Sequence, residues 1–187
     1  MQSEEERCAG AEKFRKIDAA FRAGDLDALR SAVGDPNDIP NGVMPFAIGS
    51  CLVYAIYHSP LPFIRRLLEL GADPAPVTLD GFPPLIAALS RSRSQPGSPA
   101  RPDVSDVIRT LLEFGADPAQ RGNNDYTALH MAVAERNRTA VELLLRAGAD
   151  PHVPTRIDDC ETPLEMARSA GLHDIAAILE SAEQTAR

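Results

Sequence analysis

The 187 residues of the chain suit one domain or one continuous repeat array. Apolar residues make up 44% of the sequence and aromatic residues only 5%, so a sizeable core has to be built from aliphatic side chains. With 19 Lys and Arg against 27 Asp and Glu, the net charge of −8 repels a phosphate backbone and argues against a nucleic-acid partner.

The N-terminal stretch is polar and charged, and we expect residues 1–10 to form a flexible segment. It lacks the apolar core of a secretory signal peptide. The longest apolar stretch, Val43 to Tyr57, is interrupted by Pro45 and Gly49 and is too short to span a bilayer. The three cysteines are far apart and lack metal-ligand spacing, which favours reduced thiols. These features predict a cytoplasmic protein with no membrane partner.

Three octets farther along the chain end in the same way. They are Leu67–Pro74, Leu111–Pro118 and Leu144–Pro151, each with a Leu pair, two intervening residues and then Gly-Ala-Asp-Pro. The glycine takes the left-handed conformation that stops a helix, and the proline prevents the helix from resuming. Gly115 and Gly148 are 33 residues apart, whereas Gly71 and Gly115 are 44 apart. The sequence therefore predicts a 33-residue repeat that is interrupted once.

Helix starts also recur at matching places. Thr127 and Thr162 are expected N-caps, and Pro83 stands at the matching place of the earlier repeat, where the helix is expected to lack a side-chain cap. Pro163 occupies the favoured first helical position. Between a start and the next stop, the apolar spacing predicts two amphipathic helices of about nine residues, which are not stable alone. Neighbouring repeats must cover them, which predicts a solenoid.

The most complete repeat combines both signals. Its start, Thr127-Ala128-Leu129-His130-Met131-Ala132, its second helix, Val141-Glu142-Leu143-Leu144-Leu145, and its stop, Gly148-Ala149-Asp150, resemble an ankyrin repeat. The resemblance covers nearly the whole chain. It implies an all-α ankyrin-repeat solenoid of helix-turn-helix units joined by short hairpin loops.

The resemblance further implies a single ankyrin-repeat domain over residues 11–180, followed by a fraying C-terminal tail at 181–187. We expect five units, at about 11–42, 43–77, 78–121, 122–155 and 156–180. The first unit lacks the Gly-Ala-Asp ending and is similar to an N-terminal cap, whose outer face meets water. The Ala-, Arg- and Pro-rich composition is compatible with a bacterial source.

One segment, residues 90–105, departs from the family pattern by lengthening the connection between the two helices of the third unit. Its Ser, Pro, Gly and Arg content gives it little apolar surface to bury, so we expect it to be mobile. Two interpretations stay open. The insertion is either merely tolerated, or it is a basic arm whose Arg91, Arg93 and Arg101 grip an acidic partner or flank a phosphorylated serine.

No pattern of catalytic chemistry accompanies the repeats. The sequence has neither a nucleotide-binding glycine loop nor a GxSxG motif. The resemblance makes His130 a structural residue that bridges neighbouring turns. The acidic residues of the repeated turns, Asp73, Asp117 and Asp150, are expected to stabilise their own turns. We therefore expect a protein that is not an enzyme, with no catalytic residue, metal site, cofactor or small-molecule substrate.

Proteins of the resembled family usually bind a partner protein on the concave face, through hairpin tips and first helices. Transferred to this chain, the candidate partner-binding residues are Phe46, Tyr57, His58, Leu79, Asp80, Phe82, Arg91, Asn123, Asn124, Tyr126, Glu135, Asp158, Asp159 and Glu161. The aromatic members are the most informative, because large side chains often dominate binding energy. Plain packing is the alternative, particularly for Phe46 and Phe82.

The sequence as a whole predicts a protein–protein interaction module that acts as a scaffold, an inhibitor or a neutralising partner. A self-associating structural repeat protein and an accessory subunit of an enzyme are the alternatives. Because repeat arrays share a frame and differ in what they bind, the identity of the partner does not follow from the fold.

Overall fold

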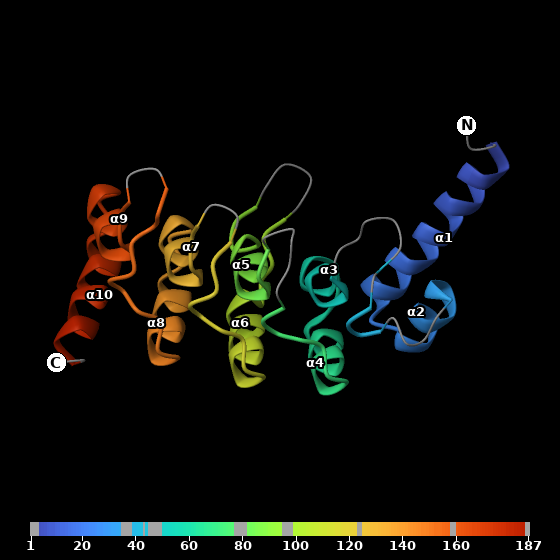
Figure 1. Cartoon of the computed structure of the whole chain (residues 1–187), viewed down its shortest axis with the longest axis horizontal. Coiled ribbons are helices and arrows are strands. Elements are labelled where there is room, and N and C mark those ends of the chain that lie inside the picture. Colours follow the sequence, from blue (N-terminus) through green and yellow to red (C-terminus); the bar gives the residue numbers. More distant parts are fainter. Residues whose placement is uncertain are drawn as a thin grey trace. The chain divides into compact units, whose positions relative to one another are not determined.

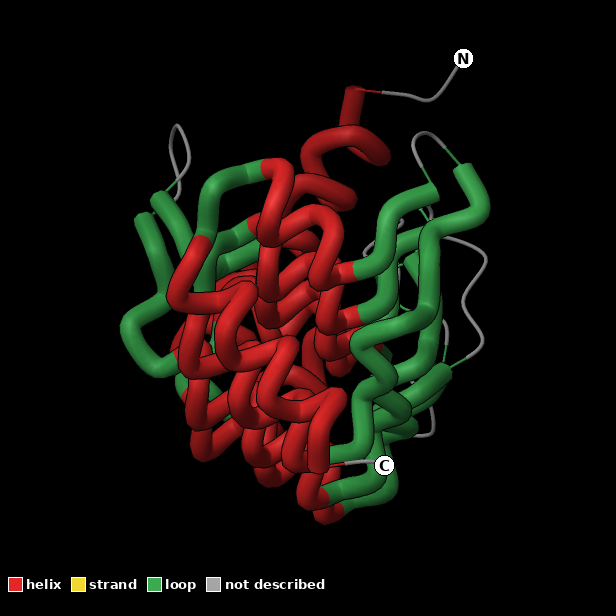
Figure 2. The backbone as a smooth tube through the Cα atoms, turned by 90° about the vertical axis from the view of Figure 1, so that its left-hand side faces the viewer, coloured by secondary structure: helices red, strands yellow, loops and turns green. Residues whose placement is uncertain are grey.

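The computed structural model describes residues 4–34, 39–42, 44, 50–76, 82–94, 99–122, 125–157 and 160–185. These residues form helices and loops without a strand, as the coloured part of the tube in Figure 2 shows. The all-α class expected from the sequence is thereby confirmed. The chain divides into two compact units, Met1–Asp73 and Pro74–Arg187, which are described separately.

Among its described residues, the first unit contains four helices, α1 (Glu4–Ala23), α2 (Leu26–Val33), α3 (Cys51–His58) and α4 (Leu61–Glu69). Helix α1 packs against α2 and α3, and α3 packs against α4. At the centre lies Phe21, fully buried, with its ring 4.8 Å from Tyr54 and 5.9 Å from Phe63 between centroids. Because α1 begins at Glu4, residues 4–10 are helical where the sequence predicted a flexible segment.

The second unit contains six helices among the described residues: α5 (Pro84–Leu89), α6 (Val104–Glu113), α7 (Ala128–Ala134), α8 (Arg138–Arg146), α9 (Pro163–Ser169) and α10 (His173–Thr185). Helices α5, α7 and α9 form one row, and α6, α8 and α10 form a second row beside it (Figure 1). Most of the buried side chains of this unit are aliphatic, including Leu85, Leu111, Leu129 and Leu144. Helix α10 continues through residues 181–185, which were expected to fray.

The predicted helix stops are confirmed. Gly71, Gly115 and Gly148 have φ values of +92°, +90° and +87°, which an L-residue rarely adopts. At each stop the glycine N–H and the following alanine N–H donate to leucine carbonyls of the last turn, as in Gly148 to Leu145 at 3.0 Å. These bonds satisfy carbonyls that the end of a helix leaves without an intrahelical partner.

The predicted helix starts are confirmed as well. Thr127 and Thr162 precede α7 and α9 with extended backbones, as N-caps do. Glu165 accepts from both the N–H and the hydroxyl of Thr162 at 2.8 Å, and the Thr162 hydroxyl accepts from the Glu165 N–H. Pro83 precedes α5 and makes no side-chain capping bond. Helix α5 is therefore the one of these three starts that lacks a cap.

The connection between α5 and α6, which the sequence predicted to be mobile, makes hydrogen bonds within the chain in the parts that the structure describes. Arg101 N–H donates to the Arg91 carbonyl at 2.9 Å, which closes the loop at its base. The Arg91 guanidinium donates to the Pro99 carbonyl at 2.9 Å, and Arg101 forms two bonds to the Asp103 carboxylate. The prediction overlooked that the arginines bond within the chain; residues 95–98 lie outside the described part.

Candidate protein-binding residues

Half of the predicted partner-binding residues belong to the described part of the chain. Phe46, Leu79, Asp80, Asn123, Asn124, Asp158 and Asp159 lie outside the described residues. Two of the other candidates lie in the first unit. The remaining five lie in the second unit, either before the N-terminal ends or after the C-terminal ends of helices in the α5, α7, α9 row.

In the first unit, Tyr57 and His58 form the end of α3, and both are half-buried. The His58 ring lies 4.4 Å from the Tyr54 ring and 6.2 Å from the Tyr57 ring between centroids. Its Nδ1 is 3.5 Å from Nη2 of Arg22, a residue of α1. The two helices thus bring an arginine beside three rings at one edge of the unit.

An acidic residue of α1 organises this edge. Asp18 accepts a hydrogen bond from the Tyr54 hydroxyl at 2.8 Å and from Nε of Arg22 at 2.7 Å. Burial opposes the ionisation of Asp18, but the bonds from Arg22 and Tyr54 outweigh it and lower the pKa of the carboxyl. Burial, together with the bond to Asp18, raises the pKa of Tyr54 to about 12.

The sequence prediction missed Asp18, Arg22 and Tyr54 as members of this cluster. Two i,i+4 spacings signal part of it, since Asp18 and Arg22 share one face of α1, and Tyr54 and His58 share one face of α3. The contact between the two helices joins residues 36 positions apart, and no local spacing indicates that.

In the second unit, three candidates occupy the same place in three neighbouring helix pairs. Phe82, Tyr126 and Glu161 each directly precede the N-cap of α5, α7 and α9. Phe82 is 46% exposed, which excludes the alternative that its ring is packed away as core. Tyr126 is half-buried and stacks on His130 with 5.5 Å between ring centroids. Since α5 packs on α7 and α7 on α9, these residues follow one edge of the row.

A buried histidine positions the Tyr126 end of this edge. His130 is fully buried, and its Nδ1 accepts from the Thr127 N–H at 3.2 Å and lies 2.8 Å from the Thr127 hydroxyl. The Nε2 side therefore carries the proton and donates to the Glu161 carbonyl at 3.2 Å. This matches the structural, turn-bridging role expected of His130. Burial lowers its pKa, which keeps the ring neutral at pH 7.

A second network fixes the loops that precede α7 and α9. Asp125 has a φ of +59° and is buried, with its carboxylate accepting from Arg121 Nη1 at 2.5 Å. From the next loop, Arg156 donates to it through the backbone N–H and two guanidinium nitrogens at 2.5 to 3.0 Å. The bonds from Arg156 lower the pKa of Asp125. The edge with Tyr126 and Glu161 thus rests on loops held by charge-assisted hydrogen bonds.

The remaining candidates, Arg91 and Glu135, follow the C-terminal ends of α5 and α7, whereas Phe82 and Tyr126 precede the N-terminal ends of these helices. Arg91 donates to the Pro99 carbonyl, and the Glu135 carboxylate accepts from Arg93 Nε at 2.6 Å. Both charges are therefore engaged within the chain. The structure does not group these two residues with Phe82, Tyr126 and Glu161.

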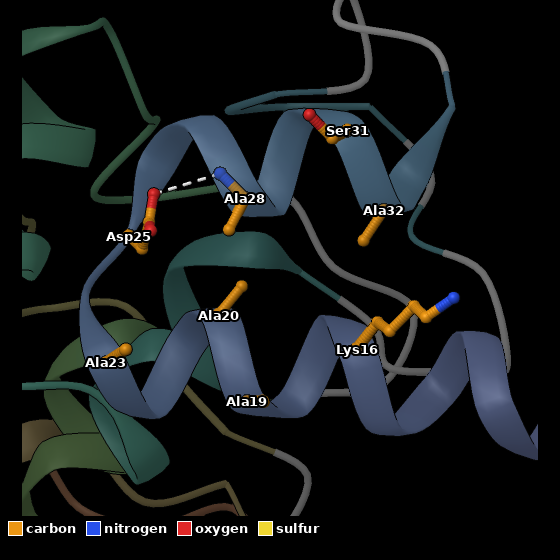
Figure 3. A pocket seen from close by; sticks show the side chains of 8 residues that line it. All are labelled: Lys16, Ala19, Ala20, Ala23, Asp25, Ala28, Ser31 and Ala32. Atoms are coloured by element: carbon orange, nitrogen blue, oxygen red, sulfur yellow. Dashed lines mark hydrogen bonds between the residues drawn. The ribbon is translucent and has the colours of Figure 1, made fainter.

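A groove of about 590 Å³ lies between α1 and α2 in the first unit (Figure 3). Its lining consists of Ala19, Ala20, Ala23, Ala28 and Ala32 with Lys16, Asp25 and Ser31. Asp25 is used as the N-cap of α2, where its carboxylate accepts from the Ala28 N–H at 2.9 Å. None of the predicted partner-binding residues lines this groove.

Among the residues that the structure describes, no three or more His, Cys, Asp or Glu form a cluster suited to a metal ion. None of the described helices has the length and apolar character needed to cross a membrane.

The comparisons with known proteins agree with the repeat pattern. A family model described as ankyrin repeats (3 copies) matches residues 100–155, and one described as ankyrin repeats (many copies) matches residues 52–95. A putative E3 ubiquitin-protein ligase, XBAT35 of Arabidopsis thaliana, is 32% identical over 134 residues, which are 71% of this chain and 26% of that protein. The chain thus spans about a quarter of the length of this curated relative. Neither the count of five ankyrin units nor a bacterial source is tested by these matches, and both stay predictions.

Proposed function

Because the chain belongs to the ankyrin repeat family, whose repeats generally mediate protein–protein interaction, we propose that it binds another protein through the edge of its second unit. The exposure of Phe82 at the start of α5 is the observation that carries this proposal. We define the partner edge by its described members, Phe82, Tyr126 and Glu161. These three residues are among the fourteen that the sequence assigned to a concave binding face.

The physical argument rests on what the partner edge offers. A large aromatic ring that the fold leaves 46% exposed has apolar area to remove from water when a partner covers it. Tyr126 adds a ring and a hydroxyl at the corresponding place of the next helix pair, and Glu161 adds a carboxylate whose Oε1 accepts from the Ser169 hydroxyl at 2.7 Å. The bonds of His130 and Asp125 hold the loops behind these residues, which limits the entropy lost on binding.

The residues at the end of α3 form a second proposed contact region in the first unit. Tyr57 and His58 are half-buried, beside the Arg22 guanidinium, whose side chain is 58% exposed. Aromatic and arginine side chains are enriched where protein interfaces carry most of their energy. This region contributes to the proposal independently of the partner edge.

The proposed role is non-enzymatic, as a scaffold, an inhibitor or a neutralising partner in the cytoplasm. The E3 ligase name belongs to a relative of which this chain spans about a quarter, and we do not transfer that activity. Self-association and service as an accessory subunit of an enzyme are the competing roles. Sedimentation velocity at micromolar concentration separates the first, since a monomer excludes self-association at that concentration.

The test compares binding by matched aromatic variants. The partner is captured from an extract of the source organism and purified, and its Kd is measured by calorimetry. Phe82→Ala and Tyr126→Ala should each weaken binding by about 30-fold, as expected for an interface anchor that contributes about 2 kcal/mol. Phe14→Ala is the control, because Phe14 is a 38% exposed aromatic residue of α1 outside the proposed surface. Equal affinity of the folded Phe82→Ala, Tyr126→Ala double variant and the wild type contradicts the proposal.

A further inference from the structure

Helix α5 is buried along its length but lacks a side-chain cap at its start. Its six residues make it the shortest helix among those that the structure describes, and Pro83 gives it no side-chain cap. The corresponding helices α7 and α9 begin with the Thr127–His130 and Thr162–Glu165 hydrogen bonds. A helix this short depends on contacts with the rest of the protein.

The C-terminal end of α5, in contrast, is tied to the next helix pair. The N–H groups of Ser90, Arg91 and Ser92 continue the helical turns by donating to carbonyls of residues 86, 88 and 89. The side chains that follow then reach the turn between α7 and α8. Arg93 Nε donates to Glu135 at 2.6 Å and its Nη2 to the Ala134 carbonyl at 3.3 Å.

A second bond runs beside this ion pair. Asn137 Nδ2 donates to the Ser92 hydroxyl at 3.1 Å, while the Asn137 side-chain oxygen caps α8 by accepting from the Ala140 N–H at 3.0 Å. One residue therefore begins α8 and contacts the segment that ends α5. The contacts join residues 41 to 45 positions apart and so connect different repeats.

The chemistry of this junction suits a cation. The last carbonyls of α7 carry the negative end of the helix dipole, and the Glu135 side chain is only 12% exposed. An arginine presents several donors in a planar fork, so Arg93 reaches the carboxylate and a helix carbonyl together. The serine beside it provides the acceptor that Asn137 uses.

From these contacts we propose that Ser92 and Arg93 form an inter-repeat clasp that couples the α5–α6 pair to the α7–α8 pair. The clasp compensates for the missing cap at Pro83 by anchoring the other end of α5. In repeat proteins, stability is a sum of the stabilities of the units and of their interfaces, so the clasp adds to one interface term. The extended connection after α5 thereby has a structural role and is more than a tolerated insertion. The clasp does not depend on the proposed partner edge, since it is measured in the isolated protein.

The test is amide hydrogen exchange of the full chain, followed by NMR. Arg93→Ala should accelerate exchange at the Ser92 and Asn137 amides, which bond to Leu89 and Ala132 carbonyls, by about fivefold. Ser92→Ala should accelerate the same amides to a smaller extent. Arg109→Ala is the matched control, because Arg109 pairs with Asp106 within α6 and its loss should leave those amides unchanged.

Charge reversal distinguishes a clasp from a general loss of stability. Arg93→Glu should accelerate exchange at both amides, and adding Glu135→Arg should restore protection to within about twofold of the wild type. The proposal is overturned if Arg93→Ala leaves both amides unchanged, if Arg109→Ala accelerates them equally, or if the reversed pair gives no restoration.

Discussion

Replacing His130 by alanine tests how the second unit is held together. The imidazole is fully buried and makes three hydrogen-bond contacts, two with Thr127 and one with the Glu161 carbonyl. Because both Thr127 contacts share the single lone pair of Nδ1, the ring makes about two net bonds, and about 1 kcal/mol for each gives about 2 kcal/mol before any cost of the cavity left behind. We therefore expect His130→Ala to lower the free energy of unfolding by at least about 2 kcal/mol.

Urea unfolding followed by circular dichroism measures this change from the shift of the midpoint at constant slope. His173→Ala serves as the control, because His173 is exposed at the start of α10 and should change stability by less than about 0.5 kcal/mol. A loss below about 1 kcal/mol for His130→Ala would refute the reasoning, since the buried bonds would then contribute little.

The pH dependence gives a second readout of the same residue. Burial lowers the pKa of His130 in the folded state, so the unfolded chain binds more protons between that lowered pKa and its own value of about 6.5. The contribution of the neutral ring is complete above about pH 6.5 and is lost as the pH falls towards the folded pKa. His130→Ala should therefore flatten the stability curve below pH 6.5, and an unchanged slope would contradict the assignment.

Three other substitutions follow from single features of the structure. Gly148→Ala should lower the stability measured by thermal unfolding by about 1 kcal/mol, because its φ of +87° strains an L-residue. No further cost is expected, since an added Cβ meets nothing within 4 Å. Gly24→Ala should cost more, since φ is +69° and its Cβ would lie 3.1 Å from Pro60 Cγ. Asp125→Asn keeps a residue that tolerates positive φ but removes the carboxylate held by Arg156. Because the folded pKa of Asp125 is lowered, the carboxylate stabilises the fold above about pH 3.9, and this stabilisation is lost as the pH falls through the folded pKa. The free energy of unfolding of the variant should therefore fall less steeply in acid than that of the wild type.

The helix boundaries of the repeats followed from the sequence because they depend on local chemistry. Gly115 and Gly148 end helices through their own backbone freedom, and Thr127 and Thr162 begin helices through their own hydroxyls. The missing cap at Pro83 was predictable for the same reason. Each of these features needs only a few neighbouring residues to form.

The contacts that organise the candidate surfaces were not predictable in the same way. Asp125 bonds to Arg156, 31 residues later, and Arg93 to Glu135, 42 residues later, so each pair meets only when two repeats pack. Composition alone predicted a mobile insertion because it does not show that Arg93 reaches an acceptor on the next repeat. The start of α1 was missed because its first residues, Glu4 to Arg7, are charged and lack the apolar period on which a helix prediction depends.

The partner edge was predicted from local helix starts, and in the structure it also depends on the packing of neighbouring repeats. Phe82, Tyr126 and Glu161 were predicted from their places before helix starts, and the structure puts them at equivalent places of three packed helices. Their engagement by a partner stays a prediction. Glu135 and Arg91 were assigned to the same surface by position in the repeat, but they lie at the opposite helix ends and bond within the chain.

The most direct measurement of the central claim is a hydrogen-exchange footprint of the complex with the captured partner. We predict slower exchange on binding at the amides around Phe82 and Tyr126, and no change along the exposed face of α6 that carries Arg109. Protection confined to α6, α8 and α10, with none at Phe82 or Tyr126, would contradict the account.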